Sequence, residues 1–370
     1  MNIALCTPFK PLDHPTVSGD VTIARDLVSA LEGLGHRVAV LPHFPARRIW
    51  NRPVRWPGAL LAADRMVRAA RGADCWLTYG SYYKVPDVFG PTASRRLGIP
   101  YFLFQASFAP GRGKRAATWP GFVLNRRAML RADHVFLNRI NDVDGCCGLL
   151  PPDRYSYVRP GLPAGLFVRD EAARQRLRGA WRADGGVVVV TAAMMRHGVK
   201  AEGLTWVIDA CAELVGQGRN LRLAVAGDGP RRGEIESLAR QRLGERVAFL
   251  GLVERAGLAE IFSAGDLFAF PGLRESVGMV YLEAQACGLP VVATDDEGAP
   301  HVVAHDRSGL ITPADRAAFT RAVDRLASDA ELRHRLGAGA GTYVRERHDL
   351  AENFRAMART MESITFGRHS

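Results

Sequence analysis

Short apolar runs alternate with amphipathic stretches along this chain, and the alternation occurs in two separate series. A strand, a helix and a second strand joined by right-handed crossovers form a parallel sheet with helices on both faces. The strands are expected at 3–6, 37–42, 75–78, 100–104, 134–137 and 155–159, and then at 186–193, 221–226, 247–250, 266–270 and 289–293. The sequence therefore predicts an α/β fold with two doubly wound parallel-sheet domains.

Helices are expected between these strands and throughout the last part of the chain. The expected helices are 21–34, 91–97, 122–131, 203–217, 232–243 and 258–263, one from Val277 onward, and 317–328, 330–336, 340–346 and 350–364. Ligands of such sheets bind beyond the carboxyl ends of the strands, where loops lead into helices. The candidate residues below are therefore sought at those loops.

Length and composition indicate a globular protein of two or three domains. The 370 residues are 47% hydrophobic and 24% charged, which is ordinary for a chain with a sizeable core. No apolar run approaches the 18 residues of a membrane span, and the amino terminus enters a strand without the charged segment of a signal peptide. The six cysteines lack metal-site or disulfide spacing. We therefore expect a reduced, cytoplasmic protein.

The excess positive charge lies entirely in the first half of the chain. Residues 1–165 contain 22 Lys and Arg against 11 Asp and Glu, whereas residues 166–370 contain 27 of each kind. Such asymmetry indicates an anionic partner for the first half. A phosphorylated substrate, an anionic acceptor and an acidic membrane surface are the three candidates, and one diphosphate carries too little charge to explain the excess.

Two glutamates, Glu275 and Glu283, are eight positions apart in a segment expected to be a strand, a loop and a helix. A helix starting near Val277 would place Glu283 about 9 Å along its axis. The first turn of such a helix offers unpaired N–H groups and positive dipole to an anion. A sugar nucleotide, with a diphosphate between sugar and ribose, would meet both carboxylates. The alternative is a chance pair of surface glutamates.

Two cations follow the Val-rich strand at 186–193. Arg196 and Lys200 lie where a diphosphate would be bound, Arg through its planar fork and Lys as a point charge. The next strand ends in Ala226-Gly227-Asp228-Gly229-Pro230, whose glycines permit close approach of backbones. Alternatively, the cations are solvated and the glycines only form a turn.

Together these segments resemble the retaining glycosyltransferases of family 4 (glycosyl transferases group 1), which have the GT-B fold. The shared features are the Glu-x7-Glu run, the Arg–Lys pair and the Gly-Asp-Gly-Pro turn. The resemblance implies two Rossmann-like domains that face a central cleft. Residues 1–165 would bind the acceptor, residues 166–349 would bind the nucleotide sugar, and residues 350–370 would return to the first domain. The alternative for the last helix is packing on the second domain only.

The resemblance also implies roles for individual residues. Glu275, Arg196 and Lys200 are expected to be catalytic, with the two cations stabilising the departing diphosphate. The expected donor-binding residues are Gly19, Gly227, Val277, Gly278, Met279, Val280 and Glu283. Gly19 is part of Ser18-Gly19-Asp20, where the family often has two adjacent glycines and this chain has one.

One family feature is missing from the first domain. Many members have a His after the strand equivalent to 100–104, near the transferred sugar, and this chain has Gln105 there. A glutamine can donate a hydrogen bond but cannot shuttle a proton. Gln105, Ser107 and Tyr79 are the candidates for the acceptor and sugar pocket. Asp142-Val143-Asp144 has a metal-binding pattern of another glycosyltransferase fold, but we interpret it as a charged turn and expect no metal or cofactor.

An arginine-rich and aromatic stretch, residues 44–71, includes Trp50 and Trp56. Interleaved Arg and Trp are typical of a membrane interface. Gly111–Arg115 and Arg126-Arg127 extend this basic region. The alternative is a solvated basic face with two core tryptophans, and no nucleic-acid recognition motif accompanies it.

The sequence thus predicts a metal-independent, retaining glycosyltransferase. It would move a sugar from a nucleoside-diphosphate donor, UDP rather than GDP, to a glycan or glycolipid acceptor of cell-envelope polysaccharide or lipopolysaccharide biosynthesis. We expect it in the cytoplasm, peripherally on the inner face of the cytoplasmic membrane. The alternatives are a nucleotide-sugar epimerase of the same fold and a glycosyltransferase with a soluble acceptor.

Overall fold

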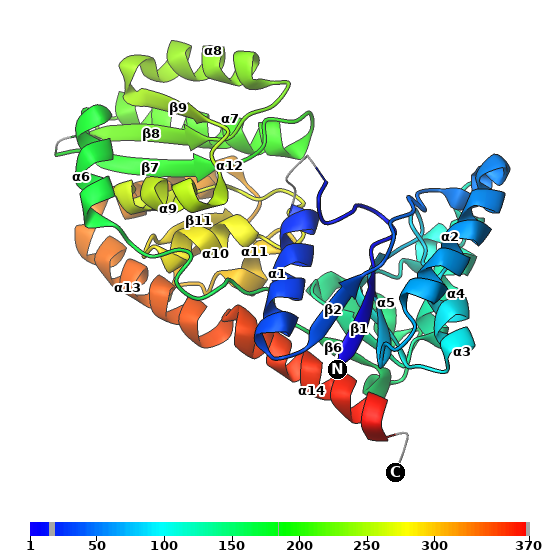
Figure 1. Cartoon of the computed structure of the whole chain (residues 1–370). Helices are drawn as coiled ribbons and strands as arrows, with labels where there is room; N and C mark the ends of the chain where they lie inside the picture. The colour runs from blue at the N-terminus through cyan, green and yellow to red at the C-terminus, as the bar shows by residue number, and fades with distance from the viewer. Residues whose placement is uncertain (15–18, 184, 368–370) are drawn as a thin grey trace. The chain divides into compact units, whose positions relative to one another are not determined.

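The computed structural model describes residues 1–14, 19–183 and 185–367. It contains two compact units, one formed by Met1–Arg159 with the segment from Leu350 onward, and the other by Pro160–Asp349. Each unit is built on a six-stranded sheet whose paired strands all run parallel (Figure 1). The predicted α/β class with two parallel-sheet domains is confirmed.

The sheet of the first unit has the strand order β2-β1-β3-β4-β5-β6. Its strands are β1 (Asn2–Cys6), β2 (Arg37–Val40), β3 (Cys75–Ser81), β4 (Tyr101–Ala106), β5 (His134–Leu137) and β6 (Tyr155–Tyr157). Its helices are α1 (Gly19–Gly33), α2 (Trp56–Ala69), α3 (Gly90–Leu97), α4 (Trp119–Arg131), α5 (Ile140–Cys147) and α14 (Leu350–Gly367), with short 3-10 turns η1 (Ile49–Asn51), η2 (Pro53–Arg55), η3 (Pro110–Arg112) and η4 (Pro152–Arg154).

Alternate residues of these strands pack on different helices, as the period of two requires. Ala4, Trp76 and Leu103 belong to a core cluster that also includes Met66 of α2. Phe104 lies against Phe354 of α14, with ring centroids 5.6 Å apart. Helix α14 also packs along α1 (Figure 1). The last helix of the described chain therefore completes the core of the first unit.

The sheet of the second unit has the strand order β12-β11-β10-β7-β8-β9. Its strands are β7 (Val187–Ala192), β8 (Leu221–Ala226), β9 (Val247–Gly251), β10 (Leu267–Ala269), β11 (Val291–Thr294) and β12 (Gly309–Thr312). Its helices are α6 (Glu171–Ala180), α7 (Val199–Gly216), α8 (Arg232–Leu243), α9 (Arg255–Ala264), α10 (Met279–Ala286), α11 (Ala299–Val302), α12 (Arg316–Ser328) and α13 (Ala330–Arg347), with the 3-10 turn η5 (Gly244–Arg246).

The direction of this sheet's strand order reverses once. The chain adds β8 and β9 on one side of β7, and then β10, β11 and β12 on the other. Successive connections therefore diverge at the carboxyl ends of β7 and β10. Such a topological switch point is where open α/β sheets bind their ligands.

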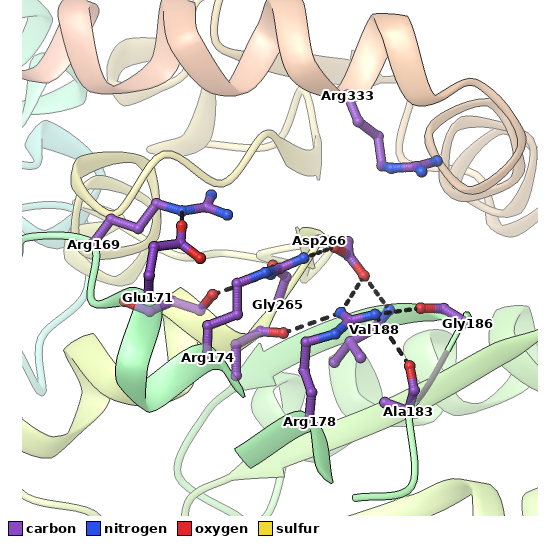
Figure 2. Close-up of polar contacts among 12 residues, drawn as sticks. Arg169, Glu171, Arg174, Arg178, Ala183, Gly186, Val188, Gly265, Asp266 and Arg333 are labelled. Atoms are coloured by element: carbon purple, nitrogen blue, oxygen red, sulfur yellow. Dashed lines mark hydrogen bonds and ion pairs between the residues drawn. The ribbon is translucent and has the colours of Figure 1, made fainter. Parts of the chain in front are cut away.

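At the opposite end of β10, Asp266 joins the sheet to helix α6 (Figure 2). Its carboxylate accepts hydrogen bonds from Arg174 at 2.6 Å, from Arg178 at 2.7 Å and from the N–H of Val188 at 2.8 Å. Burial alone would raise the pKa of Asp266, but the bonds from Arg174, Val188 and Arg178 outweigh it and lower the pKa. The ionised carboxylate thus fixes α6 to the amino-terminal ends of the central strands β10 and β7.

Several helices differ from the sequence prediction. Helices α2, α5, α6 and α11 were not expected, and α7 and α9 begin earlier than expected. Helix α10 begins at Met279 instead of Val277, because Gly278 has a left-handed backbone with φ of 78°. Residues 330–336 and 340–346 belong to one continuous helix, α13. A Cβ at Gly337 would lie 2.5 Å from the carbonyl oxygen of Gly288, so the glycine permits close packing and does not end the helix.

None of the helices in the described part of the chain combines the length and apolar composition that crossing a bilayer requires.

Candidate functional site

Three loops converge at the switch point of the second sheet. They follow β8, β7 and β10, which are neighbours in the sheet. The loop after β7 leads to α7, and the loop after β10 leads to α10. Parallel strands end at one edge of a sheet, so these loops form one continuous surface.

The loops after β7 and β8 are bonded to each other through their backbones. Met195 donates to the carbonyl of Asp228 at 2.9 Å and accepts from Arg231 at 3.0 Å. A Cβ at Gly227 would lie 2.0 Å from the carbonyl oxygen of Ala193, and the φ of Gly227 is 131°. Gly227 is therefore required for contact between the two loops, whether or not it also contacts a bound ligand.

The loop from Pro271 to Gly278 is held in place by the segment after β11. The N–H and hydroxyl of Thr294 both donate to the carbonyl of Pro271, and the N–H of Gly298 donates to the carbonyl of Glu275 at 2.8 Å. A Cβ at Gly298 would lie 2.5 Å from that same carbonyl oxygen. The backbone around Glu275 is thus fixed on both sides.

Tyr281 of α10 supports this loop from below. Its ring is fully buried, and its hydroxyl donates to the carbonyl of Phe270 at 3.1 Å. Burial, followed by the charges of Glu275 and Asp296, raises its pKa well above the ordinary value, so the hydroxyl stays protonated as a donor. Residue 272 has to be a glycine, because a Cβ at this position would lie 2.0 Å from the hydroxyl oxygen of Tyr281.

The structure brings two of the three predicted catalytic residues together. The Nζ of Lys200, in the first turn of α7, lies 3.0 Å from Oε2 of Glu275. Both side chains are partly exposed, at 43% for Lys200 and 21% for Glu275. Arg196 is exposed in the loop before α7, and its guanidinium forms no ion pair with any described residue. The carboxylate of Glu275 is therefore fixed in contact with the ammonium of Lys200. Arg196, in the loop just before α7, is a second cation nearby in sequence and has no acidic partner among the described residues.

The start of α10 offers several backbone donors. Among the described residues, the N–H groups of Gly278, Met279 and Val280 have no hydrogen-bond acceptor. These are the donors that the first turn of a helix leaves without an intrahelical partner. Together with the helix dipole they can bind an anion. Val277, the fourth residue of the predicted set, is buried just before the helix.

Glu283 is buried one turn further along α10, and it faces a cation that the sequence analysis did not identify. The Nε of Arg255, at the start of α9, lies 3.3 Å from Oε1 of Glu283. The guanidinium also lies over the ring of Phe167, 5.7 Å from its centroid. The available signal was the position of Arg255 a few residues after the expected strand at 247–250, and the expected helix start at Leu258 obscured it.

In the first unit, Gly19 is the first residue of α1, and the preceding residues 15–18, Ser18 included, are outside the described residues. Tyr79 lies at the carboxyl end of β3 and is buried, with its hydroxyl donating to the carbonyl of Asp20 at 2.7 Å. Burial, with the charges of Asp20 and Asp26, raises its pKa well above the ordinary value. Tyr79 therefore positions the start of α1, and its hydroxyl is already bonded.

Gln105 is the penultimate residue of β4, and Ser107 comes directly after that strand. Gln105 has a left-handed backbone, with φ of 58°, and within the described residues its side-chain amide makes no hydrogen bond. Such strain in a residue other than glycine occurs at functional sites. Ser107 is held through its backbone: its N–H donates to the carbonyl of Ser81 at 2.9 Å, and its carbonyl accepts from the side-chain amide of Asn125 at 2.9 Å. Asp142 is buried in α5, so the predicted charged turn at Asp142–Asp144 is wrong: these residues belong to a helix.

No cluster of three or more potential metal-ligating side chains occurs among residues 1–14, 19–183 and 185–367.

The family model described as "Glycosyl transferases group 1" matches residues 186–329. The chain is 31% identical over 183 residues to "Alpha-D-kanosaminyltransferase" of Streptomyces kanamyceticus, which covers 49% of this chain and 47% of that protein. It thus spans about half the length of this relative.

A second relative is matched over more of its length. The chain is 30% identical over 303 residues, 77% of both proteins, to "GDP-mannose-dependent alpha-(1-6)-phosphatidylinositol monomannoside mannosyltransferase" of Mycolicibacterium smegmatis. Among solved structures, that of Anabaena Alr3699/HepE in complex with UDP has the same fold, with a TM-score of 0.76 over 98% of this chain and 100% of that one at 19% identity. The sequence features and these similarities together establish that the chain belongs to the glycosyl transferases group 1 family and has the GT-B fold.

Proposed function

We propose that the protein transfers a sugar from a nucleoside-diphosphate sugar to an acceptor hydroxyl, with retention of anomeric configuration and without a metal ion. The observation that carries the proposal is the arrangement at the switch point of the second sheet. Lys200 is 3.0 Å from Glu275, Arg196 has no acidic partner within the described chain, and the N–H groups at the start of α10 are unused. A diphosphate complements these donors, and the sugar it carries complements the carboxylate.

In the proposed reaction the bond between the anomeric carbon and the diphosphate oxygen breaks, and the acceptor oxygen bonds to the same face of the sugar. The acceptor proton ends on the departing phosphate. Arg196, Lys200 and the N–H groups of α10 stabilise the charge that develops on the diphosphate. Glu275 binds sugar hydroxyls and offsets positive charge on the ring, while Glu283 binds the ribose hydroxyls.

Lys200 would exchange partners during this cycle. In the structure its ammonium faces Glu275, and at 43% exposure its flexible side chain has room to move. A bound diphosphate would compete with the carboxylate for the ammonium and release oxygens of Glu275 for sugar hydroxyls. Donor binding thereby prepares the carboxylate for its role.

For the donor we propose a UDP-sugar rather than a GDP-sugar. The solved structure of similar fold contains UDP, whereas the mycobacterial relative is named as GDP-mannose-dependent. A thermal-shift panel of uridine and guanosine diphosphate sugars distinguishes the two. The nucleotide that raises the melting temperature of the wild type, and does so less in the Arg196→Ala variant, is the donor nucleotide.

For the acceptor we propose a glycan or glycolipid of cell-envelope biosynthesis at an anionic membrane surface on the cytoplasmic side. The support is the charge of residues 1–165 and the phosphatidylinositol mannoside in the name of the mycobacterial relative. Transfer to a soluble acceptor at equal efficiency would contradict this part of the proposal.

The test of the reaction is release of nucleoside diphosphate by the full chain, with product analysis. We expect Glu275→Gln and Arg196→Ala each to reduce turnover about 100- to 1000-fold, the loss typical of removing one group that stabilises transition-state charge. Arg240→Ala, which removes an exposed cation of α8 that pairs with Glu236, is the control and should leave turnover unchanged. Near-normal transfer by both site variants would refute the assignment, and epimerised donor in the absence of acceptor would indicate an epimerase.

A further inference from the structure

Helix α2 in the first unit exposes both of its leucines, while smaller side chains and one methionine face the core. Ala59, Ala63 and Met66 pack on the core cluster beneath the helix. Leu60 and Leu61 point the other way and are 73% and 63% exposed. A helix that only covers a core has the opposite arrangement, with its leucines inside. The outward face of α2 therefore has the composition of a contact surface.

Other large apolar side chains of the same unit are exposed as well. They include Val54 of η2, Trp56 at the start of α2, and Trp119 and Val123 of α4. With Leu60 and Leu61 these residues are named here the apolar ridge.

Residues of the 3-10 turn η1 contact both helices that bear the ridge, α2 and α4. The indole N–H of Trp56 donates to the carbonyl of Ile49 at 2.9 Å. A Cβ at Gly121 of α4 would lie 2.5 Å from the ring of Trp50. The ridge is therefore held on packed elements, so its side chains are not exposed merely because a loop is loose.

The segments that carry the ridge are strongly basic. Residues 44–71 contain seven Arg and one acidic residue, Asp64, and residues 110–131 contain six Lys and Arg and no acidic residue. Asp64 is paired with Arg68 and lies 3.8 Å from Arg96. Among the described residues, Arg126 and Arg127 of α4 form no ion pair. The ridge is thus apolar, and the charge around it is almost entirely positive.

We propose that this face of the first unit docks on an anionic lipid bilayer, with the apolar ridge inserted at the level of the headgroups. Aromatic and aliphatic side chains enter the interfacial region, tryptophan favours the headgroup level, and surrounding cations bind acidic lipid. This proposal deepens the proposed function. It relies on that function only for the purpose of docking, which would be to bring the enzyme to a membrane-bound acceptor.

Two other occupants fit the surface less well. A nucleic acid would contact the cations but offers nothing to an exposed pair of leucines. A second copy of the chain, related by two-fold symmetry, would place each cation-rich face against its own image. An acidic bilayer is the partner that complements both the charge and the apolar centre.

Co-sedimentation of the full chain with phosphatidylcholine vesicles, with and without phosphatidylglycerol, tests the proposal. We expect binding only to the vesicles that contain phosphatidylglycerol, weakened by salt, and accompanied by a blue shift of tryptophan fluorescence as Trp56 and Trp119 enter the interface. Replacing both leucines (Leu60→Ser, Leu61→Ser) should weaken binding at least about tenfold, because each removes an inserted aliphatic side chain. Arg126→Gln with Arg127→Gln should weaken it by about fivefold per charge.

Matched controls lie in the second unit. Leu252, in the loop between β9 and α9, is 69% exposed, and Arg321 of α12 is also exposed. Leu252→Ser and Arg321→Gln should leave vesicle binding unchanged. An unaltered melting temperature and donor-induced thermal shift in the leucine variant would show that its fold and donor site are intact.

The proposal is overturned if the wild type does not bind acidic vesicles, or if the leucine variant binds them as the wild type does. It is also overturned if the leucine substitutions abolish dimerisation or nucleic-acid binding while the protein ignores vesicles. Vesicle binding without any donor-induced thermal shift would refute the proposed function and leave the docking surface standing.

Discussion

Replacing Asp266 by alanine would remove the single carboxylate that holds α6 to the amino-terminal ends of β10 and β7 in the second sheet. The side chain is 16% exposed and accepts from Arg174, Arg178 and the N–H of Val188. Both guanidinium groups are themselves largely buried, at 19% and 18% exposure. The substitution would therefore leave two buried cations without their counter-ion and one backbone donor without an acceptor.

The expected cost follows from that geometry. Removing one partner of a buried ion pair costs about 3–5 kcal/mol. Because Asp266 keeps some contact with water, we expect the lower end, about 3 kcal/mol. For a unit of this size each kcal/mol lowers the melting temperature by about 2–4 °C. The Asp266→Ala protein should therefore melt about 6–12 °C below the wild type at neutral pH.

The effect should depend on pH in a defined direction. The pKa of Asp266 is lowered in the folded protein from its ordinary value of 3.8. Its contribution to stability is therefore fully present above pH 3.8 and is lost as the pH falls through the lower folded value. The stability difference between wild type and the uncharged Asp266→Asn variant should accordingly shrink below pH 3.8.

Thermal and urea unfolding followed by circular dichroism would measure both effects. The exposed ion pair Arg176–Glu260 also involves α6, which it joins to α9, and it provides the matched control. Glu260→Ala should cost well under 1 kcal/mol, as exposed pairs do. A loss below 1 kcal/mol in Asp266→Ala, or a loss equal to that of the control, would refute the reasoning.

Three further predictions concern the loops and thiols. Gly227→Ala places a Cβ 2.0 Å from the carbonyl of Ala193 at a φ of 131°, so we expect a lower melting temperature and impaired donor binding, and a wild-type thermal-shift profile would contradict this. Arg255→Met removes the cation 3.3 Å from the buried carboxylate of Glu283, and should lower both stability and donor affinity; unchanged affinity by calorimetry would show that this pair does not shape the site. Cys147 is the exposed thiol, while burial raises the pKa of several others to about 12, so a thiol reagent at pH 8 should modify one cysteine in the native protein and six after denaturation.

The central parallel strands were predictable because they are buried on both faces and therefore appear as apolar runs such as Val187–Ala192. The outer strand β12 (Gly309–Thr312) was not predicted. Helix α2 was not predicted, since its two leucines are exposed while Ala59 and Ala63 pack on the core, which defeats an argument from hydrophobic periodicity. The break expected within α13 was wrong because a glycine needed for packing looks the same in sequence as a glycine that ends a helix.

The site was predictable as a set of residues at strand ends, but its contacts were not. Glu275 and Lys200 are distant in sequence, and only the pairing of β10 with β7 brings their loops together. Arg255 was missed because no motif marks it. Its relevance follows from the position of α9 beside α10, which only the tertiary structure determines.

The place of α14 in the first unit has a consequence for biosynthesis. A ribosome completes the sheet that contains Phe104 before it makes any of the second unit, and Phe354 emerges only afterwards. Until then the face of the sheet that contains Phe104 is not covered by α14, and this exposed hydrophobic surface can aggregate or bind chaperones. The amino-terminal unit thus begins folding first and matures last, so truncations that delete the final helix should yield insoluble protein even though they leave every strand intact.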